Sequence, residues 1–260
     1  MIKAVFLDVD GTLVSFKTHT VPQGTRDAIR ELRKKGVKVF VATGRMLPML
    51  DEVLDGIEFD GYIGYNGACC VDASKEKVIY KQTIPRDELH ALAERLKYDS
   101  FPVSFMCREQ MYVNYASESV LEVARMVAVP PPLVQAPEIT IQEDVYQLCI
   151  YQEEAKLEEI MEEVLTGCEY CRWTSFFADV NVKGLDKSTG VDKVLEYFNI
   201  SLEEAMAFGD GGNDISMLKH VPLSVAMGNA AAEVKEAAFY VTESVDENGV
   251  ANALGHFGVL

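Results

Sequence analysis

Short apolar runs and amphipathic stretches alternate at the start of the chain. Apolar runs at about 2 to 8, 37 to 42 and 61 to 64 predict buried strands, and apolar residues at helical spacing from about 22 to 35 predict a helix. Strands that alternate with helices are typical of a parallel sheet covered by helices. The first part of the chain therefore predicts an α/β fold.

The same rhythm returns at the end of the chain. The expected elements are, in order, a helix at about 187 to 198, a strand at 205 to 209, a helix at 213 to 219, a strand at 223 to 227, and helices near 230 to 238 and 246 to 257. Because both ends share one pattern, we expect them to build one Rossmann-like parallel sheet.

The middle of the chain has a different pattern. From about 84 to 180, helices are mixed with hairpin-like strands. The helices are expected near 86 to 98, 117 to 127 and 153 to 166, and the strands at VSFMC, MYVNY, VYQLCIY and FFADVNV. We interpret residues 83–183 as an α+β domain inserted into a core formed by residues 1–82 and 184–260.

The composition is that of a globular protein, with 48% hydrophobic and 25% charged residues in a chain of 260. No secretory signal begins the sequence, and no apolar run reaches the roughly 18 residues of a membrane span. We therefore expect a cytoplasmic protein. The six cysteines lack the density of a disulfide scaffold, and the CxxC from Cys168 to Cys171 has no second pair to complete a zinc site.

Acidic residues outnumber basic ones by 41 to 24, which gives a formal net charge of −17. This charge argues against a protein that binds nucleic acid or an anionic membrane non-specifically. A phosphorylated ligand would need local positive charge from a metal ion, a few Lys or Arg side chains, or helix N-termini.

The first strand, in KAVFLDVDGTLV, ends at two crowded carboxylates, Asp8 and Asp10. They lie where the carboxyl edge of an α/β sheet binds ligands. Like charges this close raise one another's pKa, so the pair fits a site where a divalent cation neutralises it or one member carries a proton. A turn at Asp and Gly is the plain alternative.

Two further polar patterns follow or precede core elements. Thr43, Gly44 and Arg45 follow the second strand, where a hydroxyl and free N–H groups suit an anionic oxygen. Lys187 begins a helix, where a cation opposes the helix dipole. The plain alternatives are a strand-to-helix turn and a solvated surface lysine.

A last pattern is AMAFGDGGNDISML near the end of the chain. Asp210 ends a strand, two glycines allow the backbone to approach a ligand, and Asn213 and Asp214 begin the next helix. Asp214 could simply stabilise the N-terminus of that helix. Together the patterns bring several carboxylates, a hydroxyl and a lysine to one sheet edge, which turns alone do not explain.

These motifs resemble those of a known family. In order, DVDGT at 8 to 12, ATGR at 42 to 45, Lys187 in GLDKSTG and GDGGND at 209 to 214 are similar to the four motifs of the haloacid dehalogenase superfamily of phosphohydrolases. YNGA at 65 to 68, VAMGNA at 225 to 230 and the position of the insert resemble its Cof-type sugar phosphatases, in which the insert is a cap.

The resemblance implies a Mg²⁺-dependent phosphatase that acts through a phosphoaspartyl intermediate. Asp8 would be the nucleophile, and Asp10 the general acid and base. Thr43 and Lys187 would hold the transferring phosphoryl group. The implied Mg²⁺ ligands are Asp8, Asp10 and Asp210, with Asp214 orienting Lys187 or the metal shell, and the implied substrate ligands are Thr43, Gly44, Arg45, Asn66, Lys187 and Asn213.

The expected ligand is a small phosphorylated metabolite, with hexose phosphates favoured by the resemblance and a monomer or weak homo-oligomer as the working state. Specificity would come from the insert. Arg172, Trp173 and Asp179 are candidates there beside Arg45 and Asn66, although a solvated strand face would also explain Arg172 and Asp179. For Trp173 and the neighbouring Phe176 and Phe177, core packing is the favoured interpretation.

Two other functions fit the same motifs. A phosphomutase would pass the phosphoryl group to a second hydroxyl, and a non-catalytic domain would bind Mg²⁺ and phosphate for regulation. The second is disfavoured because Asp8, Asp10 and Lys187 are all present. A dinucleotide-binding enzyme is disfavoured because no GxGxxG follows the first strand.

Overall fold

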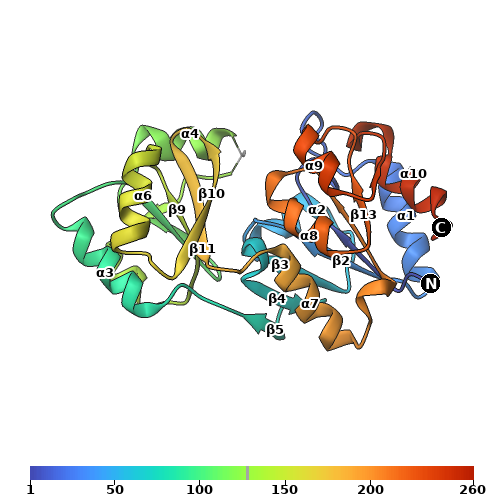
Figure 1. Cartoon of the computed structure of the whole chain (residues 1–260), viewed down its shortest axis with the longest axis horizontal. Coiled ribbons are helices and arrows are strands. Elements are labelled where there is room, and N and C mark those ends of the chain that lie inside the picture. Colours follow the sequence, from blue (N-terminus) through green and yellow to red (C-terminus); the bar gives the residue numbers. More distant parts are fainter. Residues whose placement is uncertain (127–128) are drawn as a thin grey trace. The chain divides into compact units, whose positions relative to one another are not determined.

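The computed structural model describes residues 1–126 and 129–260. The chain forms two units, one of Met1–Lys81 with Asp186–Leu260 and the other of Gln82–Leu185. Figure 1 shows the blue and red ends of the chain together in the first unit and the green and yellow middle in the second. We call them the core unit and the insert unit.

The core unit, all of whose residues are described, contains an eight-stranded sheet in the order β14-β13-β12-β1-β2-β3-β4-β5. Its strands are β1 (Ala4–Leu7), β2 (Lys38–Ala42), β3 (Gly61–Gly64), β4 (Cys69–Asp72), β5 (Val78–Lys81), β12 (Ala205–Gly209), β13 (Leu223–Ala226) and β14 (Tyr240–Val241). Neighbours from β14 to β3 run parallel, which confirms the α/β fold. β4 and β5 extend the sheet as antiparallel strands that the sequence pattern did not predict.

Helices cover this sheet (Figure 1). They are α1 (Gln23–Lys34), α2 (Leu50–Leu54), α7 (Lys187–Phe198), α8 (Ile215–His220), α9 (Ala232–Ala237) and α10 (Gly249–His256). Helix α1 packs on α10 and β2, and α7 packs on α8 and β2 to β5. The crossovers through α1 and α8 run in opposite directions along the sheet, so their common right-handedness places these helices on opposite faces.

Aromatic packing joins α7 to the middle of the sheet. Phe6 of β1 stacks on Phe40 of β2 with ring centroids 5.0 Å apart, and Phe40 meets Phe198 of α7 at 5.1 Å. Short 3₁₀ turns lie at Leu47–Met49, Tyr65–Gly67, Leu202–Glu204, Gly212–Asp214 and Val245–Glu247. Phe198 is the last residue of α7, and the N-terminal end of this helix contacts the turn at Tyr65–Gly67 and Asp214 of the turn at Gly212–Asp214 at the carboxyl edge of the sheet.

The described residues of the insert unit form a six-stranded sheet in the order β10-β11-β9-β6-β7-β8. The strands are β6 (Val103–Cys107), β7 (Met111–Val113), β8 (Leu133–Val134), β9 (Val145–Ile150), β10 (Cys168–Thr174) and β11 (Phe177–Val182). The helices are α3 (Arg86–Leu96), α4 (Glu118–Met126), α5 (Pro137–Thr140) and α6 (Glu154–Glu163). Residue 127, where the sequence pattern ends the helix, lies outside the described residues.

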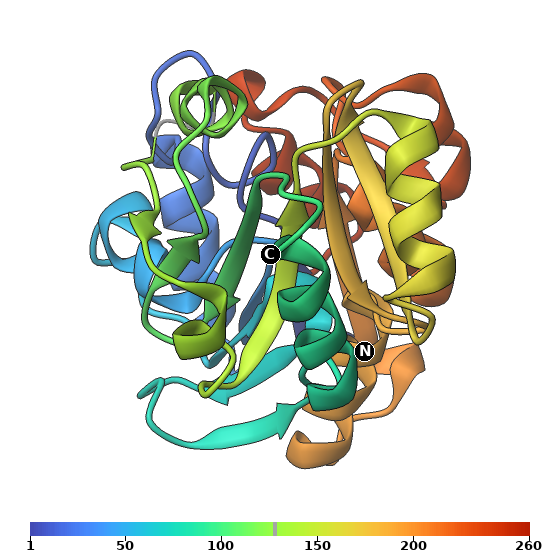
Figure 2. The same ribbon diagram turned by 90° about the vertical axis from the view of Figure 1, so that its left-hand side faces the viewer.

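Two helices of the insert unit lie side by side on its sheet. Figure 2 shows α3 in teal and α6 in yellow in front of the strands. Arg95 of α3 pairs with Glu163 of α6 at 2.8 Å, and Lys156 of α6 pairs with Asp99, just after α3, at 2.6 Å. These partly exposed pairs orient the helices more than they stabilise the fold.

All six cysteines are free thiols. Cys168 and Cys171 both belong to β10, and residues three apart in a strand point to opposite faces. Cys168 is buried and its thiol donates to Glu88 at 3.2 Å, whereas Cys171 is exposed. Among the described residues, no helix combines the length and apolarity needed to cross a membrane.

Candidate active site

The carboxyl edge of the core sheet gathers the polar residues that follow its central strands. Leu7 of β1 lies between Phe208 of β12 and Val41 of β2. The residues that continue these three strands therefore emerge side by side. Asp8 follows β1, Thr43 follows β2 and Asp210 follows β12.

Lys187 brings its ammonium group to this edge from the start of α7. Its Nζ lies 2.6 Å from Asp8 Oδ1 and 2.6 Å from Asp214 Oδ1, and the lysine side chain is fully buried. Burial alone would lower the pKa of Lys187, but the charges of Asp214 and Asp8 outweigh it and hold that pKa above its ordinary value. Lys187 is therefore a fixed positive charge and not the solvated surface residue of the alternative.

The start of α7 tolerates this cation because of Asp186. The Asp186 carboxylate caps the helix, accepting from the backbone N–H of Ser188 at 2.8 Å and of Thr189 at 3.2 Å. A carboxylate at a helix N-terminus offsets the helix dipole that Lys187 opposes.

Asp214 is fully buried and uses both oxygens. Oδ1 meets Lys187, while Oδ2 accepts from the backbone N–H groups of Asp210 and Gly211, each at 2.9 Å. A Cβ on Gly209 would lie 2.5 Å from the Asp214 side chain, so only glycine leaves room for it. Asp214 thereby positions both Lys187 and the loop that carries Asp210.

Asp210 is held by two residues that the sequence analysis did not select. Thr12 donates to its Oδ1 at 2.9 Å, and Asn229 donates to its Oδ2 at 3.0 Å and to the Gly11 carbonyl at 2.9 Å. Both had a signal in the sequence, because Thr12 belongs to DVDGT and Asn229 to VAMGNA. Burial raises the pKa of Asp210 to about 7, against the hydrogen bond from Thr12 that lowers it.

Asp8, Asp210 and Asp214 form an acidic group that could hold a cation, since oxygens from all three lie within 4.8 Å of one another. Burial and then the charge of Asp214 raise the pKa of Asp8. When all three carboxylates are ionised, one ammonium group neutralises only one of their three negative charges. The donor set therefore fits a divalent cation with oxygen ligands.

Asp10 lies next to this group and is paired with Arg45. Arg45 Nε donates to Asp10 Oδ2 at 2.7 Å and Nη2 donates to Oδ1 at 2.6 Å. Both side chains are partly exposed. The Arg45 backbone N–H also donates to Thr43 Oγ1 at 3.1 Å within the loop after β2, while the Arg45 side chain ties that loop to the turn after β1 through Asp10.

A strained turn places Asn66 at the same edge. Tyr65, Asn66 and Gly67 have φ values of 53°, 53° and 104°. This is unusual for a buried tyrosine, and such strain persists where the surroundings enforce it. Asn213 donates to Asn66 Oδ1 at 2.9 Å, and a Cβ on Gly44 would lie 2.9 Å from the same oxygen. The structure thus brings Gly44, Asn66 and Asn213 together.

The candidates in the insert unit lie in and beside its sheet. Arg172 donates to the Gln152 carbonyl at 3.1 Å and pairs with Glu154 at 3.1 Å. Asp179 is buried and accepts from the Cys149 thiol at 3.5 Å. Phe177 is buried with its ring centroid 5.3 Å from that of Tyr151, while the side chain of Trp173 lies outside the described residues.

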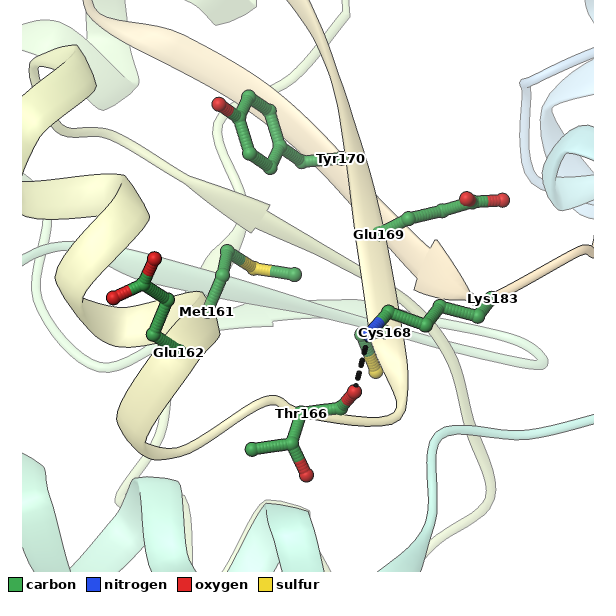
Figure 3. A pocket seen from close by; sticks show the side chains of 7 residues that line it. All are labelled: Met161, Glu162, Thr166, Cys168, Glu169, Tyr170 and Lys183. Carbon is green, nitrogen blue, oxygen red and sulfur yellow. Dashed lines mark hydrogen bonds between the residues drawn. The ribbon is translucent and has the colours of Figure 1, made fainter.

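A shallow hollow of about 440 Å³ in the insert unit contains none of the predicted site residues (Figure 3). It is lined by Met161, Glu162, Thr166, Cys168, Glu169, Tyr170 and Lys183. The Lys183 ammonium group donates to the Thr166 carbonyl at 2.7 Å, and two of the lining residues, Glu162 and Glu169, are acidic. The hollow therefore offers little to a phosphate group, and the carboxyl edge of the core sheet remains the candidate active site.

The sequence profile of the haloacid dehalogenase-like hydrolases matches residues 5–254. The chain belongs to this family. Among solved structures this hydrolase is similar to the phosphatase BT1666 from Bacteroides thetaiotaomicron, with 41% identity, a TM-score of 0.91, and coverage of 100% of this chain and 96% of the other. It is also similar to BT4131, a sugar phosphatase of subclass IIB, with 39% identity, a TM-score of 0.85, and coverage of 99% and 100%.

A curated relative gives the same class of activity. The 5-amino-6-(5-phospho-D-ribitylamino)uracil phosphatase YcsE of Bacillus subtilis (strain 168) is 31% identical over 260 residues, which cover 98% of this chain and 96% of the relative. These similarities confirm the predicted Cof-type family. This haloacid dehalogenase-like hydrolase is a phosphatase, a phosphoric monoester hydrolase.

Proposed function

We propose that this phosphatase hydrolyses small phosphorylated metabolites, foremost hexose phosphates, with Mg²⁺ and through a phosphoaspartyl intermediate on Asp8. The observation that carries the proposal is the position of Asp8. Its carboxylate is buried in an acidic group with Asp210 and Asp214, and Lys187 lies 2.6 Å away. A phosphate ester carries negative charge of its own. The Asp8 carboxylate can therefore attack it only when cations neutralise the site.

In the first step an Asp8 oxygen attacks phosphorus. The new bond joins Asp8 to the phosphoryl group while the bond from phosphorus to the leaving oxygen breaks. Asp10 gives its proton to that oxygen, so the alcohol leaves neutral. In the second step Asp10 takes a proton from water, whose oxygen attacks phosphorus and releases inorganic phosphate and free Asp8.

Asp10 must leave Arg45 and take up a proton from solvent before it acts as an acid. Two guanidinium N–H groups occupy both of its oxygens, at 2.7 and 2.6 Å. A proton donor needs one oxygen turned toward the leaving group. We propose that Arg45 exchanges Asp10 for the substrate, whose anionic phosphoryl oxygens accept the same two donors.

Mg²⁺ would be held by Asp8, Asp210 and the main-chain carbonyl of Asp10, with Asp214 orienting this group. When bound, the ion supplies the positive charge that lets a carboxylate approach a phosphate dianion and polarises the phosphoryl oxygens. Asp214 serves the site by accepting from the backbone N–H groups of Asp210 and Gly211 and by fixing Lys187.

The remaining residues would bind the phosphoryl oxygens. Lys187 and the Thr43 hydroxyl stabilise the charge that develops there, a term that dominates catalysis of phosphoryl transfer. The amides of Asn66 and Asn213 and the backbone at Gly44 extend the same polar surface. The strain at Tyr65 and Asn66 supports such a role, since strained residues cluster at functional sites.

The substrate class rests on similarity. BT4131 is a sugar phosphatase and is 39% identical, while the 31% identical YcsE acts on a phosphorylated ribitylaminouracil. Both substrates carry a polyol or sugar beside the phosphate, which supports a hydroxyl-rich leaving group here. We propose that the insert unit supplies further contacts to that group.

Phosphate release from a panel of phosphorylated metabolites tests the proposal. The chain and its Asp8→Asn variant are assayed with and without Mg²⁺. Hydrolysis that needs Mg²⁺ and is lost in the variant supports it, and a ranking led by hexose phosphates supports the substrate class. Activity in the variant would refute the phosphoaspartyl step, and turnover that depends on an added phosphate acceptor would make the protein a mutase.

A further inference from the structure

Phe16 is an exposed aromatic residue at the edge of the candidate active site. Its neighbours Val14 and Ser15 are buried, but 63% of Phe16 is exposed. The position that a Cβ on Gly11 would take is 2.7 Å from Phe16 Cε2 and 2.1 Å from Asp210 Oδ2. The ring and the Asp210 carboxylate therefore both flank Gly11.

The loop that carries Phe16 is held in place by the residues before and after it, Ser15 and Lys17. The Ser15 hydroxyl donates to Asp246 at 2.6 Å and accepts from the backbone N–H of Lys17 at 3.0 Å. The Lys17 ammonium group pairs with the same aspartate at 2.7 Å. Single exposed apolar residues are common on proteins, but this one is fixed in place beside a candidate metal ligand.

The neighbouring glycine allows the ring to approach. Gly11 has φ +84°, a conformation that favours glycine, and a side chain there would meet both the ring and Asp210. Gly11 directly follows Asp10, the residue proposed to protonate the leaving oxygen. The Phe16 ring thus lies beside the residue that follows the proposed acid.

We infer that Phe16 is a specificity-determining residue that stacks on the leaving group, and that the group it favours is a pyranose ring. This inference rests on the proposed function. One face of a pyranose presents C–H groups rather than hydroxyl groups, and an aromatic ring covers such an apolar face well. An acyclic leaving group such as glycerol offers no flat face to the ring.

The test compares a hexose 6-phosphate with glycerol 3-phosphate as substrates of the full chain with Mg²⁺. Phe16→Ala should lower kcat/KM for the hexose 6-phosphate by about tenfold, mainly through KM, and change it less than about twofold for glycerol 3-phosphate. Phe16→Tyr, which keeps the ring, should retain the preference. Phe239→Ala removes a phenylalanine that is 70% exposed elsewhere on the core unit and should change neither substrate.

The outcomes separate this inference from the proposed function. If the unmodified chain hydrolyses both substrates and Phe16→Ala lowers both equally or neither, the phosphatase proposal stands and stacking by Phe16 is wrong. If the unmodified chain prefers glycerol 3-phosphate, the pyranose assignment is wrong. If it hydrolyses no phosphomonoester, the proposed function itself fails and this inference fails with it.

Discussion

Arg45 donates hydrogen bonds to both carboxylate oxygens of Asp10, with Nε 2.7 Å from Oδ2 and Nη2 2.6 Å from Oδ1. The two residues are 35 positions apart and come from the ends of neighbouring strands, β1 and β2. In this arrangement the proposed acid cannot face a leaving group. Under the proposed function, the pair is therefore the state of the site before substrate enters.

Replacing Arg45 tests whether substrate binding depends on its positive charge or on its two parallel hydrogen bonds. Arg45→Lys keeps the positive charge but cannot form two parallel hydrogen bonds, so we expect KM for the phosphorylated substrate to rise about tenfold. Steady-state kinetics measure it. Arg26→Lys is the control, because Arg26 also donates twice to one partner, Asp55, at 3.1 and 3.0 Å, and neither residue belongs to the candidate active site. Unchanged kinetics in Arg45→Lys would contradict the exchange of partners.

Removing Lys187 should lower the stability of the fold as well as the activity. Lys187→Met leaves Asp8 and Asp214 buried without their common partner, and breaking a buried ion pair in this way costs about 3 to 5 kcal/mol. Urea unfolding in the presence of a chelator measures the loss. The exposed pair of Lys34 with Glu31 is the control, and Lys34→Met should change stability by less than about 0.5 kcal/mol. A small effect of Lys187→Met would show that the carboxylates are satisfied in another way.

The raised pKa of Asp210 predicts how the metal-free protein responds to pH. Its pKa is about 7 in the folded state against 3.8 for an ordinary aspartate, so the folded state binds the extra proton. The resulting stability is present below about pH 4 and is lost as pH rises through about 7. Thermal melting in a chelator should therefore fall from about pH 5 to about pH 8 by more in the unmodified chain than in Asp210→Asn.

Added Mg²⁺ should reverse this trend. Metal ligands must be deprotonated, so the gain in melting temperature on adding Mg²⁺ should be larger at about pH 8 than at about pH 5. The same pH dependence in Asp210→Asn would show that another group is responsible for it.

The sequence predicted most of the candidate site because strand ends are visible in a one-dimensional pattern. Apolar runs that stop at Asp8, Thr43 and Asp210 identify three strand ends, and parallel strands bring such ends to one edge. The contacts between side chains that are distant in sequence are not visible in this pattern. Nothing in the sequence pairs Lys187 with Asp8, 179 positions away, because that contact depends on how α7 packs on the finished sheet.

The strands β4 and β5 were missed although the sequence carries a signal for the turn before them. They follow the 3₁₀ turn at Tyr65–Gly67, whose left-handed backbone reverses the chain after β3. Asn66 and Gly67 are residue types that left-handed turns favour, and the pair Asn-Gly is typical of hairpins. The sequence analysis did not use this pair as a turn signal, and it predicted only the parallel part of the sheet.

That turn permits a test of Asn66. Asn66→Ala removes the amide and also places alanine, which disfavours positive φ, at a position with φ 53°. Asn66→Gly removes the amide but leaves a residue that adopts this φ readily. We expect Asn66→Ala to be less stable than Asn66→Gly by roughly 1 kcal/mol. If the amide binds substrate, both variants should lose activity to the same degree. Full activity in Asn66→Gly would mean that only the backbone matters.

The two roles of Asp10 can be separated by the choice of leaving group. Asp10→Asn should slow hydrolysis of an alkyl phosphate by about 10²-fold to 10⁴-fold, because the alkoxide leaves without a proton. The phenolate of p-nitrophenyl phosphate leaves without one, so the first step should survive while the second, which needs Asp10 as a base, stays slow. Rapid-mixing assays should then show a burst of p-nitrophenol equal to the enzyme concentration. Asp8→Asn should give no burst, and a burst that persists there would place the covalent step on a different residue.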